Sequence, residues 1–152
     1  MMLSFLCFLL TVGLTAFSAS RFQPGTWHEE LIKPSWNPPN WVFAPVWSVL
    51  YFFMAISGWL VWLQTHDPFY PALIIWILQL FVNGLWSYLF FGRHSSGLAL
   101  ADILALLALI IVFLLCAHSV STLAALLFIP YLLWVMFAAV LNFYLWQLNQ
   151  KA

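Results

Sequence analysis

The sequence predicts an all-α membrane protein: a bundle of five transmembrane helices with a long ordered loop between helices one and two. Of its 152 residues, 66% are hydrophobic and only 5% are charged, whereas a soluble domain carries about 25% charged residues. The mean hydropathy is +1.03, which leaves too few polar groups to cover a water-exposed surface. The chain also holds several uncharged segments of the length, about 20 residues, that a helix needs to cross a bilayer.

Composition and charge exclude several classes of protein. A soluble enzyme, a secreted disulfide scaffold and a disordered tail are all incompatible with so apolar a chain. Four basic residues balance four acidic ones, so no electrostatic attraction to nucleic acid is expected. Cys7 and Cys116 both lie within apolar runs, and we expect small core residues rather than a disulfide.

Charges and prolines set the boundaries of the spans within one expected domain, residues 1–152. The first span, at about residues 3–20, has no charge; a cleaved signal peptide is the alternative, although no basic residue precedes it. The lid loop (residues 21–40) holds four charges and four prolines, which favours a loop over a helix. Polar stretches separate the remaining spans, at about residues 41–63, 69–91, 97–117 and 122–148.

An odd number of spans places the two termini on opposite sides of the membrane. The first loop, the third loop and the C-terminus then share one side, which carries every basic residue: Arg21, Lys33, Arg93 and Lys151. Basic residues favour the cytoplasmic side. For a bacterial-type cell membrane, we therefore expect the N-terminus outside and the C-terminus in the cytoplasm.

Aromatic and amide side chains recur along single faces of three spans. Amides are costly in lipid, so we expect those within the spans to face inward. Tryptophan faces around buried amides suit a large, flat, mostly apolar ligand with a few polar edges, although a single aromatic face is more typical of helix packing. The candidate residues are Trp47 and Tyr51 on the second span, Asn83, Trp86 and Phe90 on the third, and Tyr131, Trp134, Ala138 and Asn142 on the fifth.

Few residues are available for catalysis or metal binding. His28, His66, His94 and His118 fall in separate loops, so no metal site is expected. Asp102 is the sole carboxylate within a span. The dipole of the helix favours a carboxylate near its start, and a proton-coupled role is the alternative.

Two features concern helix geometry. Pro130 lies inside the fifth span and should kink or loosen one turn. Gly97, Ala101 and Ala105 form a small-residue ridge on the fourth span. Such a ridge allows a close helix contact, either inside the bundle or between two copies.

Several tryptophan- and proline-rich motifs stand in order along the chain: Trp27, Lys33-Pro34-Ser35-Trp36-Asn37-Pro38-Pro39, Pro45-Val46-Trp47, Asn83-Gly84-Leu85-Trp86-Ser87, Pro130-Tyr131-Leu132-Leu133-Trp134 and Asn142. Through them the sequence resembles the translocator protein family, the tryptophan-rich sensory proteins related to the peripheral benzodiazepine receptor. The resemblance extends over about residues 3–148.

This resemblance implies a five-helix bundle, often a homodimer, whose first loop caps a pocket for porphyrins such as protoporphyrin IX, or for haem. In some members the ligand is a sterol or a synthetic compound. No cofactor other than such a ligand is implied. The residues that match the pocket motifs are Trp47, Asn83, Trp134 and Ala138 on the spans, and Trp27, His28 and Pro38 on the lid loop.

Two positions depart from the family pattern. His28 stands where members commonly carry tyrosine, and an imidazole there could ligate haem iron. The sterol motif of animal members has no counterpart near the C-terminus, where Phe143 replaces its tyrosine and Gln147 its basic residue. We therefore expect no cholesterol recognition by that route.

Three functions fit these residues. The first is a tetrapyrrole-binding membrane protein that acts as a sensor, sequestering protein or translocator, without enzymatic activity. The second is light-dependent porphyrin degradation, as reported for some bacterial members, with Trp47 and Trp134 as electron donors. The third is a structural scaffold whose tryptophans only pack. A proton-coupled exporter is disfavoured because no chain of carboxylates crosses the membrane.

Overall fold

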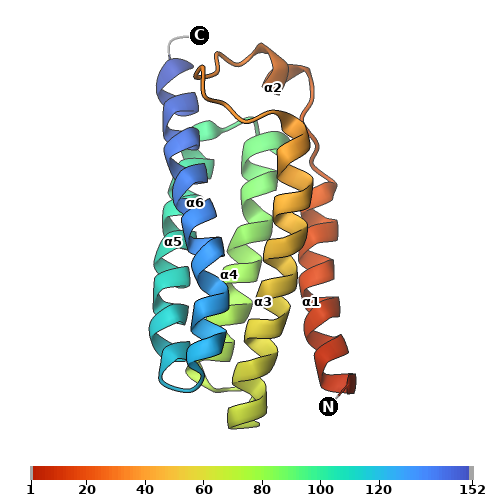
Figure 1. Cartoon of the computed structure of the whole chain (residues 1–152). Helices are drawn as coiled ribbons and strands as arrows, with labels where there is room; N and C mark the ends of the chain where they lie inside the picture. The colour runs from red at the N-terminus through yellow and green to blue at the C-terminus, as the bar shows by residue number, and fades with distance from the viewer. Residues whose placement is uncertain (1, 151–152) are drawn as a thin grey trace.

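The computed structural model describes residues 2–150 and confirms the all-helical fold. Each of five long helices is apolar enough to cross a membrane, and they stand side by side as a bundle (Figure 1). No β-strand occurs within the described range. The protein is therefore an integral, multi-pass membrane protein. The long helices are α1 (Met2–Ser20), α3 (Phe43–Thr65), α4 (Pro71–Ser87), α5 (Ser96–His118) and α6 (Thr122–Leu148).

Three short elements complete the chain. A single 3-10 turn, η1 (Asn40–Val42), leads into α3, and a π-helical turn, η2 (Tyr88–Gly92), extends α4. The lid loop contains a short helix, α2 (Thr26–Glu30), which the sequence did not predict. The Lys33 ammonium donates to the carbonyl oxygens of His28 and Glu29, and so satisfies carbonyls that the end of α2 leaves unpaired.

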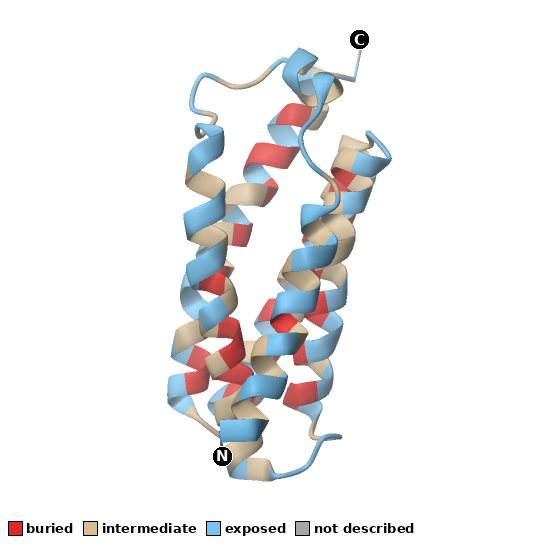
Figure 2. Ribbon diagram, turned by 90° about the vertical axis from the view of Figure 1, so that its right-hand side faces the viewer, coloured by how far each residue is buried: buried red, intermediate tan, exposed pale blue. Residues whose placement is uncertain are grey.

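The helices are arranged around the bundle in the order α1, α3, α6, α5, α4, and α4 packs against α1 to close the ring. Buried positions lie on their inner faces and exposed positions on their outer faces (Figure 2). The lid loop crosses one end of the bundle beside the end of α6, while α1 begins at the opposite end (Figure 1).

Serine caps fix the starts of the last two long helices. The Ser95 hydroxyl accepts a hydrogen bond from the amide of Leu98 at the start of α5, and Ser121 accepts one from Ala124 at the start of α6. Each satisfies one of the amides that the first turn leaves free. Pro130 does not interrupt α6, which runs through it as one helix; a local kink there stays a prediction.

The structure shows which residues of the predicted small-residue ridge pack inside the bundle. Gly97 packs against Trp146, whose indole nitrogen lies 3.0 Å from where a Cβ would be. Ala101 and Ala105 are exposed on the outer face of α5.

Both cysteines are free, but the prediction that Cys7 is a core residue is wrong: it is exposed on α1. In a membrane protein the outer surface is as apolar as the interior, so an apolar context does not indicate burial.

Candidate functional site

A chain of hydrogen bonds links α3, α4 and α6 in the interior of the bundle. The Tyr51 hydroxyl donates to Asn83 Oδ1 (2.8 Å), Asn83 Nδ2 donates to the Tyr131 oxygen (3.0 Å), and the Tyr131 hydroxyl donates to Gln79 Oε1 (3.0 Å). Asn83, Tyr131 and Gln79 are all buried. The amide of Asn83 therefore faces inward, and its hydrogen bonds replace those that lipid cannot offer.

Trp47 lies against this network from α3. Its ring centroid is 5.3 Å from that of Tyr51 and 6.2 Å from that of Tyr131. Trp47 itself is only partly buried. An indole, two phenols and the Asn83 amide thus form one cluster, in which apolar ring faces surround a few polar atoms.

A second cluster lies nearer the lid loop. Trp86 stacks on Phe90, with ring centroids 4.9 Å apart and an interplanar angle of 13°. The Trp86 indole donates to Asn142 Oδ1 (3.0 Å), and Asn142 Nδ2 donates to the carbonyl oxygen of Ser96 (2.7 Å). Asn142 therefore connects α4, α5 and α6, and it too faces inward.

Two predicted residues of the lid loop contact this second cluster. Trp27 packs edge-on against Phe90 at 5.4 Å and stacks on His94 at 4.7 Å. His28 meets Phe90 and Phe91 with its ring edge-on. Burial lowers the pKa of His28, and the positive charge of Lys33 lowers it further. The neutral imidazole is the form that ligates a metal such as haem iron.

The remaining predicted residues, Trp134, Ala138 and Pro38, lie apart from both hydrogen-bond networks. Trp134 contacts the rings of Phe43 (5.8 Å) and Phe137 (5.6 Å). Its indole nitrogen is buried and has no hydrogen-bond partner within residues 2–150. Such a group carries a desolvation cost that a ligand acceptor would relieve. Ala138 is partly buried on α6, and the carbonyl of Pro38 accepts a bond from the side chain of Asn37 (3.0 Å).

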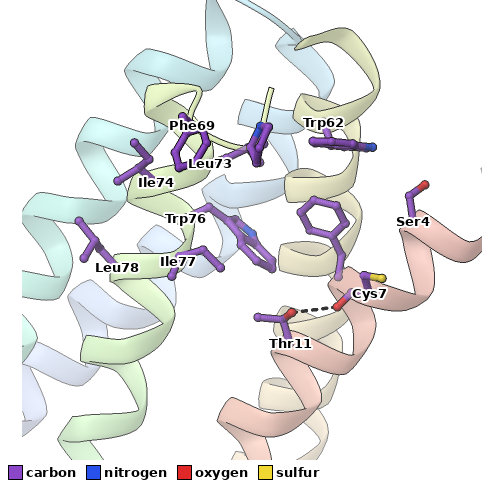
Figure 3. A pocket seen from close by; sticks show the side chains of 12 residues that line it. Ser4, Cys7, Thr11, Trp62, Phe69, Leu73, Ile74, Trp76, Ile77 and Leu78 are labelled. Carbon is purple, nitrogen blue, oxygen red and sulfur yellow. Dashed lines mark hydrogen bonds between the residues drawn. The ribbon is translucent and has the colours of Figure 1, made fainter. Parts of the chain in front are cut away.

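A cavity lies elsewhere, between α1, α3 and α4 at the end opposite the lid loop (Figure 3). Its volume is about 530 Å³, and its walls are almost entirely apolar. Trp62, Phe69 and Trp76 are among its aromatic residues. None of the twelve predicted site residues lines it.

Two buried residues of α4, Gln79 and Trp76, make polar contacts that the sequence did not predict. Gln79 receives the hydrogen bond of Tyr131 and donates to the carbonyl oxygen of Trp76 (3.1 Å). The Trp76 indole in turn donates to the carbonyl oxygen of Met54 (2.9 Å). Gln79 precedes Asn83 by four residues and so shares its helix face. The four-residue spacing from Asn83 could have indicated that Gln79 also faces inward. Within residues 2–150, no three His, Cys, Asp or Glu side chains are grouped to hold a metal ion.

The fold and the two clusters define a class: a five-helix integral membrane protein with an aromatic, amide-bearing interior beneath a long first loop. The chain belongs to the TspO/MBR family, which it matches over residues 4–147. It is 38% identical over 149 residues to Protein CrtK of Rhodobacter capsulatus, covering 95% of this chain and 92% of that protein. Over 148 residues it is 37% identical to the human Translocator protein, covering 93% and 88%. Over 145 residues it is 35% identical to the Tryptophan-rich sensory protein of Cereibacter sphaeroides, covering 95% and 90%. The resemblance noted in the sequence is thus confirmed, and the chain is a membrane protein of the TspO sensor and translocator type.

Proposed function

We propose that the protein binds a tetrapyrrole such as protoporphyrin IX in the half of the bundle nearest the lid loop, as a sensor, sequestering protein or translocator. The observation that carries the proposal is the cluster of Trp47, Tyr51 and Tyr131 around the buried amide of Asn83. Flat aromatic ligands stack on such rings, and each ring pair contributes about 0.5–1.5 kcal/mol beyond its buried area. The unpaired indole N–H of Trp134 supplies a donor for a polar edge of the ligand.

Ligand entry requires the aromatic clusters to separate, since their rings contact one another in this structure. The lid loop is the element whose movement would allow it, because Trp27 and His28 contact Phe90 at the entrance to the second cluster. Movement of a loop that covers a site is a common way of admitting a ligand to a buried position.

Titration of the detergent-solubilised protein with protoporphyrin IX tests the proposal. Porphyrin absorbance and tryptophan fluorescence are followed for wild type, Asn83→Ala and Trp134→Phe, with Trp59→Phe as the control. Trp59 lies far along α3 from the clusters, where it packs on Phe5. We expect saturable binding that Asn83→Ala and Trp134→Phe weaken and Trp59→Phe leaves unchanged. Linear, unsaturable changes identical in all four proteins would show partition into micelles, and the proposal would fail.

We further propose that the lid loop faces the cytoplasm. Arg21 follows α1, Lys33 lies in the lid loop and Arg93 follows η2, so all three stand at that end of the bundle. Lys151, the fourth basic residue, lies outside the described residues. Labelling of single cysteines introduced at Gln23 and at Asp67 in intact cells tests the orientation. Only the cysteine at position 67 should react with a membrane-impermeant thiol reagent; Cys7 and Cys116 are replaced by serine beforehand.

A further inference from the structure

The cavity between α1, α3 and α4 lies within one leaflet of the bilayer, the leaflet farther from the lid loop. At one end it is lined by Pro68 and Phe69, in the turn that joins α3 to α4. Its walls extend along α4 as far as Leu78. From Pro71 to Leu78 the helix rises about 10 Å, whereas half of the hydrocarbon core is about 15 Å thick.

The cavity opens on the outer surface of the bundle, which faces lipid. Three of the residues that α4 contributes to its walls, Ile74, Ile77 and Leu78, have exposed side chains. Trp76 is buried and lies deeper, facing Cys7 and the rest of α1 (Figure 3). A molecule dissolved in the bilayer can therefore enter the cavity sideways without passing through water.

The inner wall of the cavity is held in place by contacts of its own. The indole of Trp76 donates to the carbonyl oxygen of Met54 (2.9 Å), and its ring packs edge-on against Phe8, with centroids 5.1 Å apart. Phe8 also lines the cavity. The wall is thus formed before any ligand binds, which lowers the cost of binding.

The occupant of this cavity must be apolar. The two hydroxyl groups on its walls already make hydrogen bonds: Thr11 donates to the carbonyl oxygen of Cys7 (2.9 Å), and Ser4 accepts from the Trp59 indole (3.2 Å). None of the lining residues is charged. A buried water needs about two to four polar partners, so these walls hold water poorly, and an unfilled space would forfeit packing contacts.

The charge beside the cavity favours a lipid headgroup without net charge. Among the Asp, Glu, Lys and Arg side chains of residues 2–150, only Asp67 stands at this end of the bundle. Its Oδ1 accepts a hydrogen bond from the amide of Phe69 (2.9 Å), so it lies next to the lining residues. Anionic lipids are held by Lys and Arg. A carboxylate instead repels them and attracts the ammonium group of a zwitterionic lipid.

We propose that this cavity is a binding site for one acyl chain of a zwitterionic phospholipid, such as phosphatidylethanolamine. Its volume of about 530 Å³ falls within the range of about 300–1,000 Å³ that is typical of small-molecule sites. The chain enters beside Phe69, at the level of the headgroup, and runs between α1 and α4 towards Leu78. The site is separate from the proposed tetrapyrrole site, because none of the residues assigned to that site lines the cavity.

Lipid titration followed by native mass spectrometry tests the inference. Phosphatidylethanolamine and phosphatidylglycerol with identical chains are added separately to the detergent-solubilised protein. The double variant Cys7→Phe/Ile77→Phe places one ring in the cavity from each wall. The matched control, Leu10→Phe/Leu104→Phe, adds two rings at exposed positions that do not line the cavity. Asp67→Asn removes the charge but keeps an acceptor for the amide of Phe69.

Wild type and the control should each bind one phosphatidylethanolamine saturably, and Cys7→Phe/Ile77→Phe should lose that site. Because a ligand stabilises the state that binds it, this lipid should raise the thermal midpoint of wild type but not that of the double variant. Wild type should bind phosphatidylethanolamine about two- to fivefold more tightly than phosphatidylglycerol, as expected for an exposed charge. Asp67→Asn should abolish that preference.

Four outcomes would overturn the inference. The first is a saturable site that survives in Cys7→Phe/Ile77→Phe. The second is equal or tighter binding of phosphatidylglycerol in wild type, a measurement that does not depend on whether the double variant folds. The third is a wild-type dimer without bound lipid that the double variant converts to a monomer, which would assign the cavity to a second copy of the chain. The fourth is displacement of the lipid by protoporphyrin IX, which would place the tetrapyrrole here.

Discussion

The side-chain amide of Asn149 exchanges two hydrogen bonds with the backbone of Ile32, 117 residues earlier in the chain. The Ile32 amide donates to Asn149 Oδ1 (2.9 Å), and Asn149 Nδ2 donates to the Ile32 carbonyl oxygen (3.0 Å). The same Nδ2 also donates to the carbonyl oxygen of Leu145 in the last turn of α6 (2.8 Å). A single side chain thus ties the lid loop to the end of α6.

Replacement of Asn149 by alanine should release the middle of the lid loop. Two hydrogen bonds to the loop backbone are lost, at about 0.5–1.5 kcal/mol each. The free energy of local opening should fall by about 1–3 kcal/mol. Backbone amide exchange around Ile32 should therefore accelerate about five- to a hundredfold. Gln150→Ala, at the exposed neighbouring position, is the control. Unchanged exchange at Ile32 in Asn149→Ala would show that other contacts hold the loop.

Acidification should loosen the attachment of the lid loop through His28. Its pKa in the folded protein lies below the usual 6.5, because burial and Lys33 both disfavour the imidazolium. The detached loop therefore binds the proton more readily, and protonation favours detachment. The contribution of neutral His28 to stability is present above pH 6.5. It falls as the pH drops through 6.5, and levels off below the folded pKa.

Hydrogen exchange of α2 across this pH range measures the effect. After correction for intrinsic exchange rates, opening should increase on acidification in wild type and much less in His28→Asn. His66→Asn is the control, because His66 is exposed at the other end of the bundle. An identical pH response in wild type and His28→Asn would assign the effect to another group.

Tyr131→Phe should destabilise the bundle although it removes one oxygen atom only. Gln79 Oε1 and Asn83 Nδ2 both lose their shared partner in a dry interior. Leaving such groups unsatisfied costs about 1–3 kcal/mol. Thermal unfolding in detergent should show a lower midpoint, whereas Tyr144→Phe, at a 41% exposed phenol, should match wild type. Equal midpoints in Tyr131→Phe and Tyr144→Phe would contradict the role assigned to the network.

Gly58→Ala should also destabilise the protein, for a steric reason. A Cβ at Gly58 would lie 2.6 Å from the Trp76 ring, which is fixed by its hydrogen bond to Met54. Overpacking of this kind costs about 1–3 kcal/mol. Gly13→Ala on α1 is the matched control, because nothing lies within 4 Å of its added methyl group. The thermal midpoint of Gly58→Ala should therefore lie below that of Gly13→Ala. Equal midpoints would show that the Trp76 ring moves aside for the added methyl group.

The helical fold and the inward direction of two side-chain amides could be predicted from the sequence. In each case the alternative would leave polar groups without hydrogen bonds in lipid, at a large cost in free energy. Uncharged segments of sufficient length leave no alternative to helices in lipid. Asn83 and Asn142 would each lose hydrogen bonds if they faced lipid, and both are buried.

The partners of these groups could not be predicted. The partners depend on the rotation and register of whole helices. Examples are the oxygen to which the Tyr131 hydroxyl donates and the contact of Asn149 with Ile32. In a soluble bundle the polar stripe of each helix fixes its rotation. Here both faces of a helix are apolar, so the pattern carries little information on rotation, and the exposure of Cys7 was missed for that reason. The short helix α2 was missed because its stabilising contact, from Lys33, lies outside the helix itself.

The sparse packing of α1 has a consequence for biosynthesis. Val12 is its one buried residue among those described, and its neighbours are α3 and α4. Because α4 ends at Ser87, α1 cannot complete its contacts until more than half of the 152 residues have been made. During that interval only α3 can contact α1, so the hydrophobicity of α1 itself must contribute most of what holds it in the bilayer.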